Sequence, residues 1–232
     1  MGYLLGIDAG STNYKVIACD AAGRFLASAR RPANTKYHEN GWAETSPELI
    51  WEGVAACIAE VAAQLPGESC DGIAVASSGE DVLLDGVAQS VYPAIRWFDT
   101  RTEAIASAWE PFGRERIYRI TGINPNPVAS ITKMQWIKRY VPEAWARARL
   151  WIPIAGFISL KLTGTARAPW TNACRSMAFD LNHRDWSEEI LAEAGIERSL
   201  LAEPIRPGEQ IGALTAAAAA ATGLKEGTPV FA

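Results

Sequence analysis

The sequence has 232 residues, of which 49% are apolar and 21% charged, so it can bury a substantial core and lies within the globular range. Its formal net charge of −4 argues against binding to a nucleic-acid backbone, which needs a clustered basic surface. No apolar run reaches the ~18 residues that a membrane span needs, and the first residues lack the pattern of a signal peptide.

The N-terminal residues predict an antiparallel meander of three strands, at residues 3–8, 14–19 and 25–28. Turns at 10–13 and 20–23 separate these strands, and both are rich in residues that tolerate turn dihedrals. We therefore expect the chain to begin with a sheet.

A helix is predicted from Pro47 to about Gln64, with Ser46 as its N-cap residue. Its apolar positions recur at intervals of three and four, so one face of this helix is suited to burial. Short strands are then expected at residues 72–76, 82–84 and 92–97. This order of elements fits a mixed sheet flanked by helices, which is an α/β fold.

From Thr102 onward helical patterns dominate, which indicates a helix-rich inserted lobe. The expected helices lie at residues 103–110, 114–120, 131–139, 143–148 and 154–162. The alanine-rich run at 215–222 favours one more helix, which Gly223 would end. Residues 228–231 read as the beginning of a strand, so we expect the natural protein to continue beyond Ala232.

The first candidate site is the segment from Gly6 to Lys15, where an acidic residue leaves a strand and a tight turn follows. Backbone N–H groups and hydroxyls of such a turn can bind a phosphate, and the carboxylate can bind a magnesium ion. The residues concerned are Asp8, Gly10, Ser11, Thr12, Asn13 and Lys15. An ordinary polar hairpin would show the same short pattern, so the motif alone leaves both interpretations open.

A second candidate site follows the predicted strand that ends near Ala76. Glu80 could accept hydrogen bonds from sugar hydroxyls, and Gly79 would let a substrate approach the backbone. A solvated loop is the alternative interpretation.

A third candidate site lies at Trp97, Asp99 and Arg101. An indole face can pack against the C–H surface of a polyol, while Asp and Arg can hold hydroxyls or pair with each other. The alternative is a core tryptophan beside a structural ion pair.

The sequence offers few residues from which other kinds of catalytic or metal site could be built. With two histidines, His38 and His183, a histidine-based triad or a zinc hydrolase is not expected. The four cysteines lack the close pairing of a zinc site and are expected to be reduced, as in a cytoplasmic protein. The run at 171–176 offers no specific chemistry by itself and is interpreted as mainly structural.

Taken together and in this order, these segments resemble the FGGY family of carbohydrate kinases, which includes xylulose, glycerol, gluconate and ribulose kinases. The resemblance covers essentially all 232 residues and about the N-terminal half of a typical family member. It rests on Gly6 to Thr12 with Lys15, Gly41 to Glu48 with Trp51, Pro93 to Thr102, Thr132 and Lys133 with Trp136, and Thr171 to Trp186.

The resemblance implies an actin-like ATPase (ribonuclease H-like) domain that uses ATP and Mg²⁺. Asp8 would bind the magnesium ion and Thr12 the transferring phosphate, while Glu80 and Trp97 would contact the sugar. Asp99 and Arg101 would help to shape the pocket, beside Gly79. The family's catalytic aspartate and most of its nucleotide site would follow Ala232, so residues 1–232 would be the sugar-binding half and inactive alone.

Two departures from the family pattern bear on the substrate. Residues 77–80 are not the Gln-Met-His of typical xylulose kinases or the Gln-Arg-Glu of glycerol kinases, although Glu80 keeps the glutamate of the latter. Val128 stands where glycerol kinases carry a tyrosine. Glycerol is therefore disfavoured, and a ketose or a longer polyol stays open. Among these a pentulose such as xylulose is favoured, with a homodimer left open. An actin-like ATPase and a non-catalytic sugar-binding module are the alternative functions.

Overall fold

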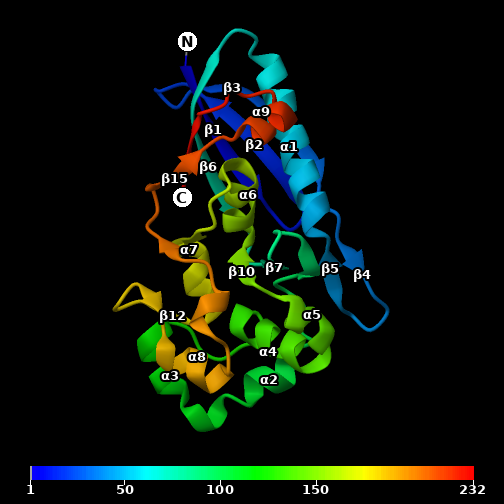
Figure 1. Cartoon of the computed structure of the whole chain (residues 1–232), viewed down its shortest axis with the longest axis vertical. Coiled ribbons are helices and arrows are strands. Elements are labelled where there is room, and N and C mark those ends of the chain that lie inside the picture. Colours follow the sequence, from blue (N-terminus) through cyan, green and yellow to red (C-terminus); the bar gives the residue numbers. More distant parts are fainter. Residues whose placement is uncertain (1) are drawn as a thin grey trace.

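The structure is a computed structural model that describes residues 2–232. A sheet with its covering helices forms one end of the molecule, and a helix-rich lobe forms the other (Figure 1). The chain enters and leaves through the sheet, because the first strands and the last strand belong to it. The helical lobe is therefore an insertion, as the sequence predicted.

The central sheet is mixed and has the strand order β15-β16-β6-β1-β2-β3. β1 pairs in parallel with β6, and β6 with β16, whereas the remaining neighbours are antiparallel. The bounds are β1 Gly2–Ala9, β2 Asn13–Cys19, β3 Phe25–Pro32, β6 Ser69–Ser77, β15 Gln210–Ala213 and β16 Pro229–Phe231. The predicted meander is confirmed, and its third strand extends to Pro32.

Alternation of side chains explains why the first strands form a covered sheet. Tyr3, Leu5 and Ile7 are buried on one face of β1, while the residues between them are more exposed. Helix α1 (Pro47–Gln64) packs against β2 and β3. The hydroxyl of Ser46 accepts from the backbone N–H of Leu49 at 3.3 Å, so the predicted N-cap is confirmed.

Sequence periodicity located five helices, to within a few residues, in residues 102–164. The first four lie in the lobe, whereas the fifth packs against β6 and β15 of the central sheet. Their bounds are α2 Glu103–Ser107, α3 Arg114–Thr121, α4 Ser130–Tyr140, α5 Pro142–Arg147 and α6 Ile154–Thr163. The later helices are α7 Trp170–Ala173, α8 Glu188–Ala194 and α9 Ala216–Thr222. As expected, α9 ends at Gly223, which has the positive φ of 71° that glycine tolerates.

The remaining strands are short and lie outside the central sheet. They are β4 Lys36–Tyr37, β5 Ala43–Thr45, β7 Asp81–Leu84, β8 Ser90–Tyr92, β9 Ala94–Ile95, β10 Leu150–Pro153, β11 Ala168–Pro169, β12 Phe179–Asp180, β13 Asp185–Trp186 and β14 Pro204–Ile205. The predicted strand at 92–97 is wrong, because Pro93 separates β8 from β9 and the strand stops at Ile95. Trp97 consequently lies in the turn that follows β9.

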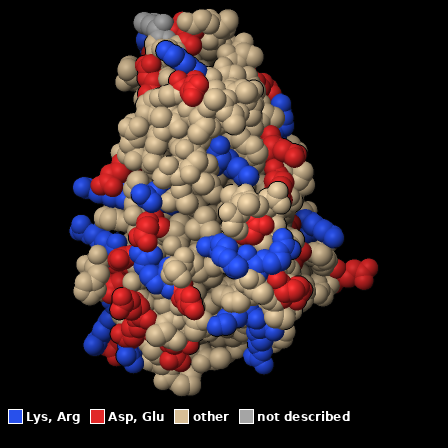
Figure 2. Space-filling model, in the orientation of Figure 1, with Lys and Arg blue, Asp and Glu red and all other residues tan. Residues whose placement is uncertain are grey.

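The surface in Figure 2 carries most of its charged side chains over the helix-rich lobe, with both signs intermixed. Mixed charges produce no strong field of one sign on this face. Within residues 2–232, none of the helices has the length and apolar character to cross a membrane.

Candidate functional site

The candidate site is built where two parallel strands end at the same edge of the sheet. β1 and β6 run in parallel, with Asp8 beside Ala76 in register. The backbone N–H and the hydroxyl of Ser78 both donate to the carbonyl of Ala9, at 3.1 and 3.2 Å. The turn at 10–13 therefore lies next to the segment that begins at Ser78.

The turn between β1 and β2 is tight. The N–H of Gly10 donates to the carbonyl of Asn13 at 3.1 Å, and a Cβ on Gly10 would stand 3.0 Å from the same oxygen. A side chain at this position would therefore be tight against the turn, which favours glycine. The hairpin places a carboxylate, a cation and two hydroxyls at its solvent-accessible tip: Asp8, Lys15, Ser11 and Thr12.

The same tip fits a magnesium ion that brings phosphate ligands with it. Mg²⁺ is usually held through one or two carboxylates together with phosphates and waters. The missing Cβ of Gly10 leaves space 3.8 Å from Oδ1 of Asp8. No group of three or more His, Cys, Asp or Glu side chains within residues 2–232 could cage a metal. The residues therefore suit a nucleotide-bound cation and offer Asp8 as its ligand.

Trp97 connects the two segments at this edge. Its indole N–H donates to the hydroxyl of Ser11 at 3.4 Å, and its backbone N–H donates to Oε1 of Glu80, also at 3.4 Å. The ring of Phe98 packs edge-on against the indole, with centroids 5.5 Å apart. Trp97 is 39% exposed. The structure thus brings together the three segments that the sequence singled out separately.

Glu80 lies beneath Trp97 and is fully buried, with an exposed fraction of 0%. Its Oε1 is 3.4 Å from Nη1 of Arg96, whose side chain is 1% exposed. Two ions taken out of water are tolerated here because each neutralises the other. A Cβ on the neighbouring Gly79 would meet no atom within 4 Å, so the backbone next to Glu80 is approachable.

Asp99 takes a different place from the one expected of a sugar ligand. It is 1% exposed, and its oxygens accept from the guanidinium of Arg101 at 2.7 and 2.9 Å and from the N–H of Ala43 at 2.7 Å. Burial alone would raise the pKa of Asp99, but these hydrogen bonds outweigh it and hold the pKa below its usual range. Asp99 is therefore a positioning residue, since both of its oxygens are engaged by the protein.

Arg101 is the centre of this buried cluster. Its guanidinium also donates to Glu44 at 2.7 Å and lies 4.2 Å from the ring centroid of Trp42 and 4.9 Å from that of Trp136. A planar guanidinium can stack and form a fork of hydrogen bonds at once, which lysine cannot. The cluster fixes the segment 96–101, which carries Trp97, onto strand β5.

Asp81, the residue after Glu80, and Lys133 are also buried, and both line one small cavity. Burial raises the pKa of Asp81 to about 6, against the opposing effects of Ser130 and Lys133. Burial likewise lowers the pKa of Lys133 to about 8, although Asp81 and Glu80 oppose the change. Nζ of Lys133 donates to the carbonyl of Arg96 at 2.8 Å, so this lysine supports the backbone just before Trp97.

A cleft of about 490 Å³ opens beside Trp97. Its walls come from the lobe as well as from the turn after β9: Trp97, Tyr118, Gly122, Ile123, Asn124, Asn126, Val128 and Arg175. This volume lies within the range of small-molecule sites, about 300–1,000 Å³. A polar small molecule in the cleft would therefore sit next to the hairpin at 10–13.

The chain matches the sequence family described as the FGGY family of carbohydrate kinases, N-terminal domain, over residues 3–232. It belongs to that family. The FGGY relatives include L-fuculokinase of Escherichia coli K12, which is 33% identical over 232 residues, covering 98% of this chain and 49% of the relative. A glycerol kinase of Methylibium petroleiphilum is 32% identical over 212 residues, covering 87% of this chain and 42% of the relative.

Solved FGGY structures agree with the fold. Xylulose kinase from Rhodospirillum rubrum superposes with a TM-score of 0.95 at 26% identity, covering 99% of this chain and 48% of that chain. Gluconate kinase from Lactobacillus acidophilus superposes with a TM-score of 0.93, also at 26% identity, covering 99% of this chain and 47% of that chain. The chain spans about half the length of the curated relatives that it matches. The expected α/β, actin-like kinase fold is confirmed.

Two residues of the segment at 171–176, whose own chemistry was interpreted as mainly structural, lie close to the candidate site. Nδ2 of Asn172 donates to the hydroxyl of Ser77 at 3.2 Å, at the end of β6. Arg175 lines the cleft beside Trp97. In the sequence, the resemblance of residues 171–186 to the FGGY pattern was the signal for this segment, rather than its own chemistry.

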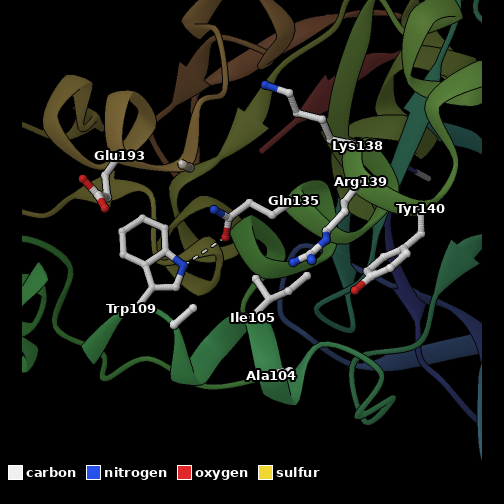
Figure 3. A pocket seen from close by; sticks show the side chains of 10 residues that line it. Ala104, Ile105, Trp109, Gln135, Lys138, Arg139, Tyr140 and Glu193 are labelled. Carbon is white, nitrogen blue, oxygen red and sulfur yellow. Dashed lines mark hydrogen bonds between the residues drawn. The ribbon is translucent and has the colours of Figure 1, made fainter. Parts of the chain in front are cut away.

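A second pocket of about 490 Å³ lies in the helical lobe, between α2, α4 and α8 (Figure 3). Trp109 forms one wall, and its indole N–H donates to Oε1 of Gln135 at 2.9 Å, as the dashed line shows. Lys138 and Glu193 give this pocket charges of both signs. It shares no lining residue with the cleft at Trp97, so the two are separate cavities.

Proposed function

We propose that the protein transfers the γ-phosphoryl group of Mg-ATP to a hydroxyl of a sugar or polyol. The observation that carries this proposal is the contact of Trp97 with both Ser11 and Glu80, because it sets an acceptor cleft directly beside a phosphate-binding hairpin. Phosphoryl transfer depends mainly on positioning and on charge stabilisation, so this adjacency is what the reaction needs.

The hairpin would bind the nucleotide phosphates. The N–H groups and hydroxyls at Ser11 and Thr12 would donate to phosphate oxygens, and Lys15 would add a positive charge beside them. Asp8 would hold a magnesium ion, which neutralises the charge that develops on the phosphoryl oxygens. On the other side of the cleft, Trp97 would orient the acceptor by packing against its C–H face.

We propose that the acceptor's proton is taken by a residue outside residues 2–232. Among the described residues, those that line the cleft include no Asp, Glu or His. Glu80 is held by Arg96 in a buried ion pair, and Asp8 is assigned to the cation. A carboxylate that is paired with an arginine or bound to a cation is a poor proton acceptor, so neither group is assigned as the general base.

The acceptor that we favour is a neutral ketose, in particular a pentulose such as xylulose. Val128 gives the cleft an apolar wall beside Trp97, and a volume of about 490 Å³ leaves room beyond a three-carbon polyol. Neutral hydroxyls also suit a site whose nearest carboxylate, Glu80, is already paired. We place the enzyme in the cytoplasm, because all four of its cysteines are free thiols.

The test is ADP release by the full-length protein with Mg-ATP and a panel of ketoses, polyols and sugar acids. We expect one neutral sugar to stimulate ADP release, and the Asp8→Asn variant to lose most of this activity at every Mg²⁺ concentration. Hydrolysis of ATP without dependence on any sugar would favour an actin-like ATPase instead. Sugar binding without ADP release would favour a non-catalytic binding module.

A further inference from the structure

The ion pair of Glu80 and Arg96 is enclosed one residue away from the cleft wall. Oε1 of Glu80 accepts from Nη1 of Arg96 and from the backbone N–H of Trp97, both at 3.4 Å. Trp97 itself lines the cleft and is 39% exposed. The pair is therefore joined to the cleft wall through the backbone of Trp97.

This pair is incompletely satisfied within the described residues. Oε2 of Glu80 has no hydrogen-bond partner, and neither have Nε and Nη2 of Arg96. Buried polar groups almost always have partners, and an unmade hydrogen bond to a charged group costs more than one to a neutral group. One acceptor and two donors of the same ion pair are thus left without partners, next to Trp97 in the chain.

Neighbouring groups do not supply the missing partners. Nζ of Lys133 is engaged by the carbonyl of Arg96 at 2.8 Å. A small cavity of about 10 Å³ lies close by, but it is lined by Asp81, Lys133 and Trp151 and by neither member of the pair. A water in that cavity would leave the free atoms of Glu80 and Arg96 unpaired.

We propose that Arg96 is a specificity-determining residue of the acceptor site and binds one acceptor hydroxyl together with Glu80. A hydroxyl is both donor and acceptor, so it can donate to Oε2 of Glu80 while it accepts from Nη2 or Nε of Arg96. Nη1 meanwhile stays bonded to Oε1 of Glu80. This inference rests on the proposed function and refines it, because it selects neutral polyhydroxy acceptors. A sugar acid would bring its carboxylate against the free oxygen of Glu80 and is disfavoured.

The experiment combines three arginine variants with acceptors that each lack one hydroxyl. The full-length protein, Arg96→Met, Arg96→Lys and the exposed control Arg147→Met are assayed for kcat, for the KM of the acceptor and for the KM of ATP. The acceptors are the sugar identified by ADP release, its monodeoxy analogues and the corresponding sugar acid. Thermal melting of each variant reports folding.

For Arg96→Met we expect the KM of the parent sugar to rise about tenfold or more, with the KM of ATP unchanged. In the wild type, the KM of one monodeoxy analogue should exceed that of the parent sugar by a similar factor. In Arg96→Met this ratio should shrink to less than about threefold, because the hydroxyl that the analogue lacks no longer has its arginine partner. Arg96→Lys should retain part of the discrimination, and Arg147→Met should behave as the wild type.

Three results would overturn the inference. The first is an unchanged KM of the parent sugar in a folded Arg96→Met variant. The second is that this variant raises the KM by the same factor for the parent sugar and for every monodeoxy analogue. The third is a sugar acid that the wild type phosphorylates as efficiently as the neutral sugar. If Arg96→Met does not fold, Arg96→Lys and the wild-type analogue series decide between the same outcomes. A wild type that phosphorylates no acceptor overturns the proposed function, whereas turnover that is insensitive to Arg96 overturns this inference alone.

Discussion

The indole N–H of Trp97 donates to the hydroxyl of Ser11, so a cleft wall and a phosphate hairpin that lie 86 positions apart in the sequence are joined by one hydrogen bond of 3.4 Å. The backbone N–H of Trp97 is bonded at the same time to Glu80. In the proposed function, an acceptor that packs against the indole would act on the turn at 10–13 through this side chain. Trp97 would then couple the orientation of the acceptor to that of the phosphate.

The first prediction concerns this hydrogen bond. Trp97→Phe keeps an aromatic face for the acceptor and removes the N–H donor, so we expect kcat/KM for the acceptor to fall about two- to tenfold, the range of one neutral hydrogen bond. Ser11→Ala removes the other partner and should show a loss of the same size. The double variant should then lose little more than either single variant, and fully additive losses would show that the two side chains are not coupled.

The second prediction concerns the buried cluster around Arg101. Arg101→Met leaves the carboxylates of Asp99 and Glu44 buried without their cation, so we expect the free energy of unfolding to fall by about 3–5 kcal/mol. The exposed arginine of an i,i+4 pair, changed as Arg119→Met, should cost less than about 0.5 kcal/mol. Urea unfolding at pH 7 measures both, and a loss below 1 kcal/mol at Arg101 would contradict the assigned role.

Local patterns of the sequence predicted most of the fold. The alternation in β1 and β2, the capped helix α1 and the helix ended by Gly223 all have signals within a few neighbouring residues. The prediction of one continuous strand at 92–97 was wrong, and this error also has a local cause. Its apolar residues suggested continuity, but Pro93 cannot take part in a ladder, and Trp97 is needed in a turn.

The candidate site was less accessible to such patterns, because its contacts join distant segments. Asp99 and Arg101 offer the same side chains whether they face a sugar or each other, and their environment is decided by Ala43 and the tryptophan rings. The burial of Glu80 and its pairing with Arg96 likewise depend on how β9 returns to the end of β6. No spacing along the chain reports those contacts.

The third prediction is a pH dependence that comes from Asp81. Its pKa is raised from the ordinary 3.8 to about 6 in the fold, so both states are protonated below pH 3.8. Between pH 3.8 and about 6 the unfolded chain releases this proton and the folded chain keeps it. The contribution of Asp81 to stability therefore falls as the pH rises, by up to about 3 kcal/mol in total.

The Asp81→Asn variant isolates this contribution. Lys133, with its pKa lowered to about 8, stays protonated throughout this pH range and adds no slope of its own. The difference in unfolding free energy, wild type minus Asp81→Asn, should accordingly decrease between pH 4 and pH 6.5 and then level off. A difference that is constant over this range would contradict the raised pKa.

The last prediction concerns the seating of α1 against the hairpin strand. A Cβ on Gly53 would stand 2.5 Å from Cδ2 of Tyr14, the residue that follows the hairpin turn and is buried under the helix. Gly53→Ala should therefore displace Tyr14 and lower the free energy of unfolding by about 1–3 kcal/mol, the cost of overpacking a core. Because Tyr14 continues directly from Asn13, the KM of ATP should rise as well.

Gly6→Ala is the matched control, since a Cβ there meets no atom within 4 Å and the backbone does not have a positive φ. It should leave the unfolding free energy within about 0.5 kcal/mol of the wild type, and the KM of ATP unchanged. If Gly53→Ala weakens folding and leaves the KM of ATP as it was, then the hairpin holds its shape independently of α1. If both glycines tolerate alanine, the close contact between Tyr14 and the helix does not determine the position of the hairpin.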